Sequence, residues 1–538
     1  MNHLGRCYQK GIGTNIDKQK AFELFQKAAS SENSDGINSL GNCYYNGIGI
    51  SINKQKAFEL YQKAANLENA NGIINLGYCY QNGIGTNIDN QKAFELYQKA
   101  ANLESSNGIY SLGYCYENGI GISIDEQKAF ELYQKAANLE NAPGINNLGR
   151  CYQNGIGTNI DKQKAIELFQ KTANLENSDG LYNLGYCYEN GIGSSINKQK
   201  AFELYQKAAN LEHVDGIIKL GYCHQDGIGT RVDKQKAFKL YQKAASLGNV
   251  YGIYNLGYCY INGIGTNVDK QKAFDLYQKA ANLGNASGIN SLGYCYRNGI
   301  GTNIDKQRAI ELYQKAADLG NAFGINNLGY CYQNGIGTGI NKQKAFELFQ
   351  KAADLKNVEG IINLGYCYQN GIGTSINKQK AFELFQTAAN LESPDGINNL
   401  GDCYQIGIGT NINKKKAFKL YQKAANLEHA DGIFKLGCCY QNGIGTSINK
   451  QKAFKLYQKA ANLEHADGII KLGFCYQNGI GTNIDKQKAF ELYLKVANLG
   501  HADGIINLGY CYQNGIGTSI DKQKAFELFQ MASNVENK

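Results

Sequence analysis

The sequence has almost no proline, no tryptophan and no long apolar run. Its only two prolines, Pro143 and Pro394, stand alone, and no linker, charge block or low-complexity segment divides the 538 residues. No stretch approaches the roughly 20 apolar residues of a membrane-spanning helix. The first six residues, Met1–Arg6, lack the apolar core of a signal peptide. We therefore expect a cytoplasmic protein without a membrane span, or a fragment of a longer chain.

Motifs that carry chemistry are also missing. The sequence contains no Cys-x-x-Cys and no His-x-x-x-His spacing that would indicate zinc. The recurring Gly-Ile-Gly segment lacks the Gly-Lys-Ser/Thr of a phosphate-binding loop. The net charge of +9 comes from scattered lysines rather than a basic run. We expect no metal, no cofactor and no catalytic site, because a catalytic site would break the repeat described next.

What the sequence does contain is one 36-residue text, repeated. A cysteine recurs every 36 residues, at Cys7, Cys43, Cys79 and onward to Cys511, which gives fifteen copies without insertion or deletion. A fixed period of this length is typical of a solenoid, in which each unit packs only on its neighbours. The expected organisation is a single array over residues 1–538, with a truncated first copy at residues 1–34.

Each copy is expected to form two helices. The first spans about residues 72–81 in the third copy, and Asn82-Gly83 ends it. The second begins after Asp89, whose carboxylate can cap it; all fifteen copies have Asp or Asn there. Both helices have one apolar face with the spacing i, i+3, i+4, i+7. The residues on these faces are Ile73, Leu76, Gly77 and Tyr80 in the first helix, and Ala93, Leu96, Tyr97 and Ala100 in the second.

The pattern Leu-Gly-x-x-Tyr-x-x-Gly-x-Gly, followed by Asp/Asn, Lys-Ala and Lys-Ala-Ala, resembles the Sel-1-like repeat over essentially the whole chain. The residues that carry the match are Leu76, Gly77, Tyr80, Gly83, Gly85, Asp89, Lys92, Ala93, Lys99, Ala100 and Ala101. The related tetratricopeptide repeat has a period of 34 and a tryptophan, which this chain lacks. The resemblance implies an all-α, right-handed α-solenoid of antiparallel helix pairs that serves as a protein scaffold or adaptor. One departure is Gly72, where the family usually has alanine.

The sixteen cysteines are expected to be free and buried. Equivalent cysteines of stacked units should lie about 10 Å or more apart, whereas a disulfide needs Cα atoms within about 7 Å. Each copy has a single cysteine at this position, so none has a partner inside its own repeat. We interpret the cysteines as small buried hydrophobic residues in a reducing compartment.

Four of the six histidines share one position between repeats: His213, His429, His465 and His501. They could form a row of ligands or a pH-sensitive edge. The alternative is a solvated loop residue, because asparagine takes this place in other copies such as Asn285 and Asn321. We favour the solvated loop residue.

Comparing the copies with one another separates two faces of the first helix. The positions of Ile74, Tyr78 and Gln81 vary; they are spaced i, i+4 and i+7, so they share one face. The fixed apolar residues lie opposite, and they include Tyr260 and Tyr296, two residues beyond Tyr258 and Tyr294. The variable face is the candidate partner-binding surface: Ile74, Tyr78, Tyr110, Tyr114, Glu117, Arg150, Tyr182, Tyr186, Tyr222, Tyr254, Tyr258, Tyr294, Arg297, Tyr330, Tyr366, Asp402, Phe434 and Phe474.

Because the first helices line the concave surface in solenoids of this kind, we expect the tyrosines to form a ladder along a binding groove for a peptide or helix of another protein. The alternative is drift after recent duplication, with tyrosines that only fill gaps. The function expected is a non-catalytic protein-interaction scaffold. The alternative function is RNA binding by helical repeats, which would need varied polar residues and a strongly basic groove. The absence of polar capping helices indicates either a longer chain or self-association through the ends.

Overall fold

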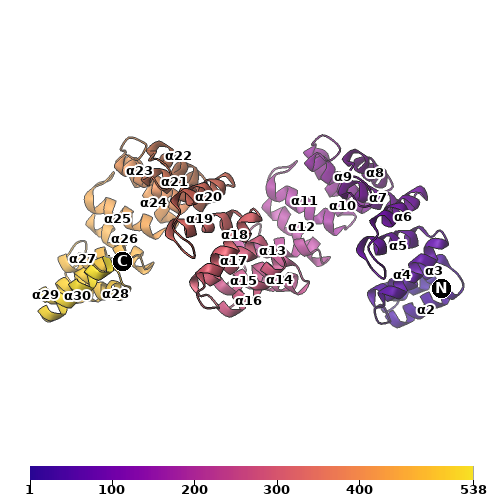
Figure 1. Ribbon diagram of the computed structural model, residues 1–538, viewed down its shortest axis with the longest axis horizontal. Helices are drawn as coiled ribbons and strands as arrows, with labels where there is room; N and C mark the ends of the chain where they lie inside the picture. The colour runs from indigo at the N-terminus through magenta and orange to yellow at the C-terminus, as the bar shows by residue number, and fades with distance from the viewer. Residues whose placement is uncertain (537–538) are drawn as a thin grey trace. The chain divides into compact units, whose positions relative to one another are not determined.

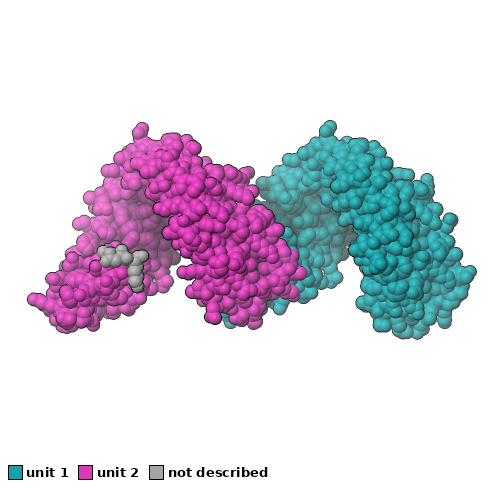
Figure 2. Space-filling model, in the orientation of Figure 1, with its two compact units in different colours: residues 1–269 teal, residues 270–538 magenta. Residues whose placement is uncertain are grey.

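The computed structural model describes residues 1–536, and over these residues it consists of thirty α-helices without a β-strand (Figure 1). The chain divides into two compact units, residues 1–269 and 270–538 (Figure 2). Unit 1 contains α1 (Asn2–Lys10), α2 (Lys18–Ser30), α3 (Ser34–Asn46), α4 (Lys54–Asn66), α5 (Ala70–Asn82), α6 (Asn90–Asn102), α7 (Ser106–Asn118), α8 (Glu126–Asn138), α9 (Ala142–Asn154), α10 (Lys162–Asn174), α11 (Ser178–Asn190), α12 (Lys198–Asn210), α13 (Val214–Asp226), α14 (Lys234–Ser246) and α15 (Val250–Asn262). Unit 2 contains α16 (Lys270–Asn282), α17 (Ala286–Asn298), α18 (Lys306–Asp318), α19 (Ala322–Asn334), α20 (Lys342–Asp354), α21 (Val358–Asn370), α22 (Lys378–Asn390), α23 (Pro394–Ile406), α24 (Lys414–Asn426), α25 (Ala430–Asn442), α26 (Lys450–Asn462), α27 (Ala466–Asn478), α28 (Lys486–Asn498), α29 (Ala502–Asn514) and α30 (Lys522–Glu536).

Within each unit the helices form a stack of antiparallel pairs, as predicted. Each odd-numbered first helix packs on the even-numbered second helix that follows it, and that second helix packs on the next first helix. First helices of consecutive repeats also contact each other directly, for example α3 with α5 and α17 with α19. Second helices make no comparable contact with one another over residues 1–536. The first helices are therefore the more closely spaced row, which is the row on the inside of a curved stack.

The ends of the helices follow from local sequence. Asp89 Oδ1 accepts a hydrogen bond from the backbone N–H of Lys92 at 3.0 Å, so the predicted cap of the second helix is confirmed. The first helix begins at Ala70, two residues earlier than predicted, because Asn69 Oδ1 accepts the N–H of Gly72 at 2.9 Å. It ends at Asn82, and the following Gly83 has a φ of 67°, the left-handed conformation that glycine adopts at little cost.

Gly72 stands at a close approach between two repeats. A Cβ atom placed on this glycine would lie 2.6 Å from Cβ of Ala64, on the second helix of the preceding repeat. The equivalent glycines meet an alanine, a threonine or, for Gly504, the side chain of Val496 in the same way. Glycine lowers helix propensity here, but the backbone of the first helix can then lie directly against its neighbour. This contact explains why alanine is absent from the position.

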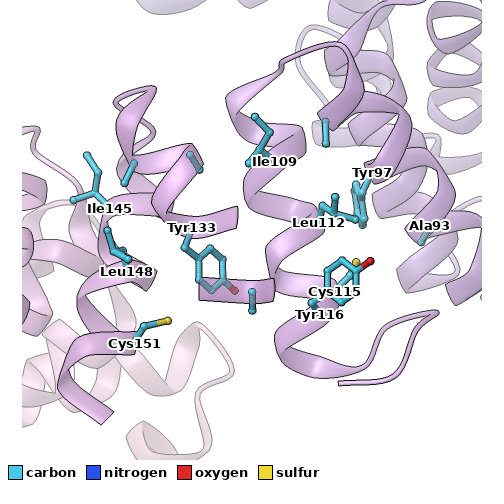
Figure 3. Close-up of a cluster of buried hydrophobic side chains, with 14 residues drawn as sticks. Ala93, Tyr97, Ile109, Leu112, Cys115, Tyr116, Tyr133, Ile145, Leu148 and Cys151 are labelled. Atoms are coloured by element: carbon cyan, nitrogen blue, oxygen red, sulfur yellow. The ribbon is translucent and has the colours of Figure 1, made fainter. Parts of the chain in front are cut away.

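The predicted apolar faces form the core. Figure 3 shows the cluster around α7, in which Ile109, Leu112 and Cys115 lie between the second helices of their own and the preceding repeat. Tyr97 and Tyr133, which belong to those second helices, are almost fully buried. Similar clusters recur along both units, and each joins the second helix of one repeat to the helices of the next.

The lysine at the third position of the second helix has a packing role that the sequence did not reveal. Lys92 Nζ lies 5.2 Å from the ring centroid of Tyr80, the fixed tyrosine of the first helix. The edge of that ring meets Phe58 of the preceding repeat, with centroids 5.5 Å apart and planes at 83°. The tyrosine is thus held between a phenylalanine and a cation. Such cation–π contacts are attractive, which offsets the unfavourable position of the lysine near the helix N-terminus.

The cysteines are as expected. All sixteen are free, and only Cys7 and Cys438 are partly exposed. Burial raises the pKa of the Cys79 thiol to about 11 and that of Cys115 to about 12. The neutral thiol is therefore the form present throughout the physiological range.

The segment that follows the second helix contains a residue with a left-handed backbone conformation in every copy in which both helices are followed by another repeat. Directly after the second helix, Glu104 adopts a left-handed conformation with φ of 56°, and nine other copies also place Glu or Lys in it. Four copies carry glycine instead, Gly248, Gly284, Gly320 and Gly500, with φ between 75° and 80°. A side chain with a Cβ atom is strained in this region, whereas glycine is not.

Replacing Glu104 by glycine should relieve this strain. We expect Glu104→Gly to stabilise the repeat by about 0.5–1 kcal/mol, and the reverse change Gly320→Glu to destabilise its repeat by a similar amount. Hydrogen exchange of the amides in the adjacent helices measures both. Equal protection in the two variants would show that the left-handed residue carries no strain.

The buried thiols should be slow to react. Native protein at pH 8 should be labelled by a maleimide mainly at Cys7 and Cys438, and all sixteen cysteines should react after denaturation without reductant. Because the folded pKa of the buried thiols lies above the unfolded value, stability should fall as pH rises through the unfolded pKa toward the folded one. Unreactive thiols in the denatured, unreduced protein would contradict the free-thiol structure.

Candidate functional site

The two faces predicted for the first helix are separated in the structure. On the variable face, Tyr258 and Tyr294 are each 42% exposed, whereas Tyr296 on the fixed face is 7% exposed. The other exposed aromatic residues at the same position are Tyr78, Tyr114 and Tyr186 in unit 1, and Tyr330, Tyr366, Phe474 and Tyr510 in unit 2. Tyr222 is more buried, and its hydroxyl group donates a hydrogen bond to Oδ1 of Asn255 in the next repeat and accepts one from its Nδ2. Each unit therefore carries its own row of half-exposed aromatic rings.

The residues at the position of Ile74 are less exposed than these rings. Ile74, Tyr110, Tyr182, Tyr254 and Phe434 are partly buried. Tyr182 stacks on His213 with centroids 4.9 Å apart, and Phe434 stacks on His465 at 5.0 Å. These residues connect first helices of successive repeats, so they shape the surface more than they protrude from it.

The third variable position has a structural role. Gln81 Oε1 accepts a hydrogen bond from the hydroxyl of Tyr97 at 2.9 Å, and Glu117 accepts one from Tyr133 at 2.5 Å. Burial, followed by the bond to Glu117, raises the pKa of Tyr133 far above its ordinary value. In these copies the side chain at this position therefore satisfies a buried hydroxyl group of the same repeat.

Arg297 is an exception at this position. The buried tyrosine beneath it is Tyr313, whose hydroxyl oxygen has no hydrogen-bond partner in the part of the chain that the structure describes. A guanidinium group has hydrogen-bond donors only, so it cannot accept a hydrogen bond from the tyrosine hydroxyl group. An unsatisfied buried hydroxyl group costs about 1–3 kcal/mol.

A row of amide side chains next to the tyrosines escaped the sequence comparison. Asn75 Nδ2 donates to Asn38 Oδ1 of the preceding repeat at 2.8 Å. Similar bonds of 2.9 Å join further first helices: Asn183 to Asn146, Asn327 to Asn290, and Asn363 to Asn326. The available signal was a position occupied in nearly every copy by Asn, Ser or Lys. The row links consecutive repeats and lies along the same surface as the aromatic rings.

Charged residues on the variable face mostly pair across repeats. Arg150 lies 3.3 Å from Glu117, and Lys219 lies 2.8 Å from Glu189. In unit 2, Lys435 lies 2.8 Å from Asp402 of the preceding repeat and 2.8 Å from Asp431 on its own helix. Burial raises the pKa of Asp431, but hydrogen bonds from His465 and Lys435 outweigh burial and hold it well below its ordinary value. Arg150, Glu117 and Asp402 are thus neutralised within the protein.

Two hollows in unit 1 bring these positions together. The first, of about 430 Å³, is lined by residues from the first helices of five consecutive repeats: Arg6, Asn38, Asn42, Asn71, Ile74, Asn75, Asn107, Tyr110, Ser111 and Pro143. The second, of about 300 Å³, is lined mainly by Tyr78, Gln81, Tyr97, Tyr110 and Tyr114. Both are open, so the variable face of unit 1 forms a shallow groove with aromatic and amide walls.

The prediction of a solvated loop residue is wrong for His213, His429 and His465, whereas His501 is exposed and makes no side-chain cap bond. His213 and His429 each cap a first helix. Their Nδ1 atoms accept hydrogen bonds from the backbone N–H groups of Gly216 and Gly432, at 3.0 and 3.1 Å. The Nε2 atom of His213 lies 3.1 Å from Asp179, which belongs to the first helix of the preceding repeat. Asparagine caps the same helix in most other copies, which explains why the two residues alternate.

Two negative findings concern residues 1–536. No group of three or more His, Cys, Asp or Glu side chains is arranged to hold a metal ion. None of the helices in this part of the chain combines the length and apolar character needed to cross a bilayer.

A family model described as Sel1 repeat matches fifteen consecutive segments, from residues 1–33 and 34–69 through to 502–535. No curated protein matches the chain. Among solved structures, a protective antigen of uropathogenic Escherichia coli, c5321, with an SLR fold is 25% identical, with 89% of this chain and 97% of that chain covered and a TM-score of 0.47. A Sel1 repeat protein from Oxalobacter formigenes is 27% identical, with 45% and 96% covered and a TM-score of 0.42. Yeast Tom70 is 15% identical, with 94% and 96% covered and a TM-score of 0.32.

The hydroxyl groups beneath the groove should differ in their contribution to stability. Tyr97→Phe removes the bond to Gln81 and should weaken its repeat by about 0.5–1.5 kcal/mol. Tyr313→Phe removes a hydroxyl group without a partner and should leave stability unchanged or raise it. Other copies carry phenylalanine here, as at Phe169 and Phe349, so both variants should fold. Hydrogen exchange in α6 and α18 checks the contrast, and an equal loss in both would contradict it.

Proposed function

The chain belongs to the Sel1 repeat family, and from this premise we propose that it is a non-catalytic scaffold that binds another protein along its first helices. Repeats of this kind generally serve protein interaction. The finer proposal is that an extended peptide or a helix of the partner lies on the variable face, across several consecutive repeats of one unit. The free thiols with raised pKa are consistent with a reducing compartment such as the cytoplasm.

The observation that carries this proposal is the row of half-exposed aromatic side chains. A tyrosine such as Tyr330 remains 42% exposed on a helix whose Ile325 and Leu328 are buried. Tyrosine is enriched in protein interfaces, because it offers a large apolar area and a polar tip at little entropic cost. The neighbouring amides, such as Asn327, can both donate and accept, which suits the peptide groups of an extended chain.

The charge of the same face favours a protein over RNA. Binding to RNA draws on unpaired cations that meet successive phosphates. Here Arg150, Lys219 and Lys435 are paired with carboxylates of the protein itself. The remaining residues of the face are mainly tyrosine and asparagine, which supports the peptide as the ligand.

One exposed tyrosine pair and one buried tyrosine on unit 2 separate binding from stability. Changing Tyr294 and Tyr330 together to alanine should leave the fold intact, because both rings are half exposed, but should weaken partner capture by tenfold or more. Changing Tyr296 alone should instead open a cavity and destabilise the protein by about 3–5 kcal/mol. Pull-down from lysate of the source cells measures the first effect, and thermal unfolding measures the second.

Treatment of the pull-down with ribonuclease tests the competing function. Captured proteins should survive the digestion and should be lost with the Tyr294/Tyr330 double variant. Partners that disappear on digestion would favour RNA binding. If both tyrosine sets destabilise alike and neither changes capture, the variable face is not the binding surface.

A further inference from the structure

Arg297 differs from three other cations on the variable face and in the adjoining row of amide side chains. Arg150, Lys219 and Lys435 each lie within 3.3 Å of a carboxylate oxygen. Arg297 is partly buried on α17, and within residues 1–536 no carboxylate lies within ion-pairing distance of it. The charge of Arg297 is therefore not neutralised by a carboxylate in the part of the chain that the structure describes.

Two tyrosine rings fix the position of this cation. The guanidinium carbon lies 5.3 Å from the ring centroid of Tyr294 and 5.4 Å from that of Tyr330, in the next repeat. Contacts over both rings orient the planar group. A guanidinium carries five N–H donors in a fixed fork, which matches the two oxygens of a carboxylate. The flanking rings are each 42% exposed, so the site opens to solvent.

The two first helices that carry the site, α17 and α19, supply no counter-charge. In the sequences of α17 and α19, Arg297 is the only charged residue, and Asn, Ser, Tyr and Phe make up the rest of the exposed face. Phe323, at the other end of α19, is 54% exposed and adds apolar area to the same helix. A ligand that carries one negative charge among apolar groups complements this surface.

The arginine also replaces a group that the fold uses elsewhere. In other repeats the buried tyrosine donates a hydrogen bond from its hydroxyl group to Gln81, Glu117 or Glu189. Arg297 cannot accept such a bond, and the hydroxyl group of Tyr313 is left without a partner. This repeat thus lacks an internal hydrogen bond and has instead an unpaired cation between two aromatic rings.

We propose that Arg297, with Tyr294 and Tyr330, binds the side-chain carboxylate of an aspartate or glutamate within an extended peptide that lies along α17 and α19. This inference rests on the proposed function and names the chemistry of the partner. An acidic side chain within the peptide fits better than a chain end, because the row of exposed rings continues at Tyr366. A polynucleotide fits poorly, because the residues equivalent to Arg297 in the next two repeats are the uncharged Gln333 and Gln369.

The test uses the full chain and a random peptide library displayed on phage. Peptides selected against the wild-type protein should share an Asp or Glu at one position, and synthetic copies then give dissociation constants. Replacing that residue by Gln or Asn should weaken binding to the wild type about tenfold or more and should have little effect on binding to Arg297→Gln. The Arg297→Gln variant should fold, because glutamine is the usual residue here and supplies the acceptor that Tyr313 lacks.

Arg308→Gln is the matched control. Arg308 belongs to the same repeat and also lies over a tyrosine ring, 4.7 Å from the centroid of Tyr296, but on the fixed side. This variant carries the same charge change and should bind the acidic peptide as the wild type does. Peptide affinity that falls equally in both variants would reduce the effect to net charge and overturn the proposal.

The remaining outcomes distinguish a failure of the carboxylate site at Arg297 from a failure of the proposed peptide binding. If selected peptides depend on Tyr294 and Tyr330 but show no preference for an acidic residue, the carboxylate site is wrong and the groove stands. If their binding depends on neither tyrosine, the groove and the carboxylate site both fail. If no peptide is selected, and a single-stranded RNA oligonucleotide binds the wild type but not Arg297→Gln, the ligand is a phosphate chain and the proposal is overturned.

Discussion

The rest of the structure depends on the contact between a glycine of the first helix and an aromatic ring of the second. A Cβ atom on Gly77 would lie 2.8 Å from Cε1 of Tyr97, so the ring rests directly on the helix backbone. Every pair of helices that contains this contact is held at one short distance. A second glycine, Gly72, allows the same close approach to the preceding repeat. Because both contacts recur, small differences between copies do not alter the stack.

This contact also couples the core to the surface. The ring that covers Gly77 carries a hydroxyl group, which reaches Gln81 on the exposed side of the same first helix. A residue on the variable face is therefore chosen partly by the core beneath it. Glu117 shows both roles, since it accepts the hydroxyl of Tyr133 and pairs with Arg150 of the next repeat. At Arg297 this link is broken, and within residues 1–536 no carboxylate pairs with the arginine, which lies between two aromatic rings.

Much of the fold could be read from the sequence because the copies are aligned by their period. The spacing of Ile73, Leu76 and Tyr80 identified the buried face, and the Asp or Asn at the position of Asp89 identified a helix start. The start of the first helix was missed by two residues, since its cap, Asn69, varies to Ser or His in other copies. The same variation hid the capping role of the histidines. A cap is recognised by a hydrogen bond to the backbone, which several residue types can make.

The sequence by itself determined the repeat, the two helices of each copy and the division of Tyr78 from Tyr80 into opposite faces, because helical periodicity places residues on faces without reference to other segments. Only the tertiary structure decided what each position meets across the stack. Asn75 bonds to Asn38, and the ring of Tyr80 lies between Phe58 and Lys92; these contacts join residues that are distant in sequence. The position of Arg297 between two rings without a carboxylate depends on which residues its neighbours in the stack carry. Such contacts follow from the distance and angle between repeats, which the spacing of apolar residues along one helix does not specify.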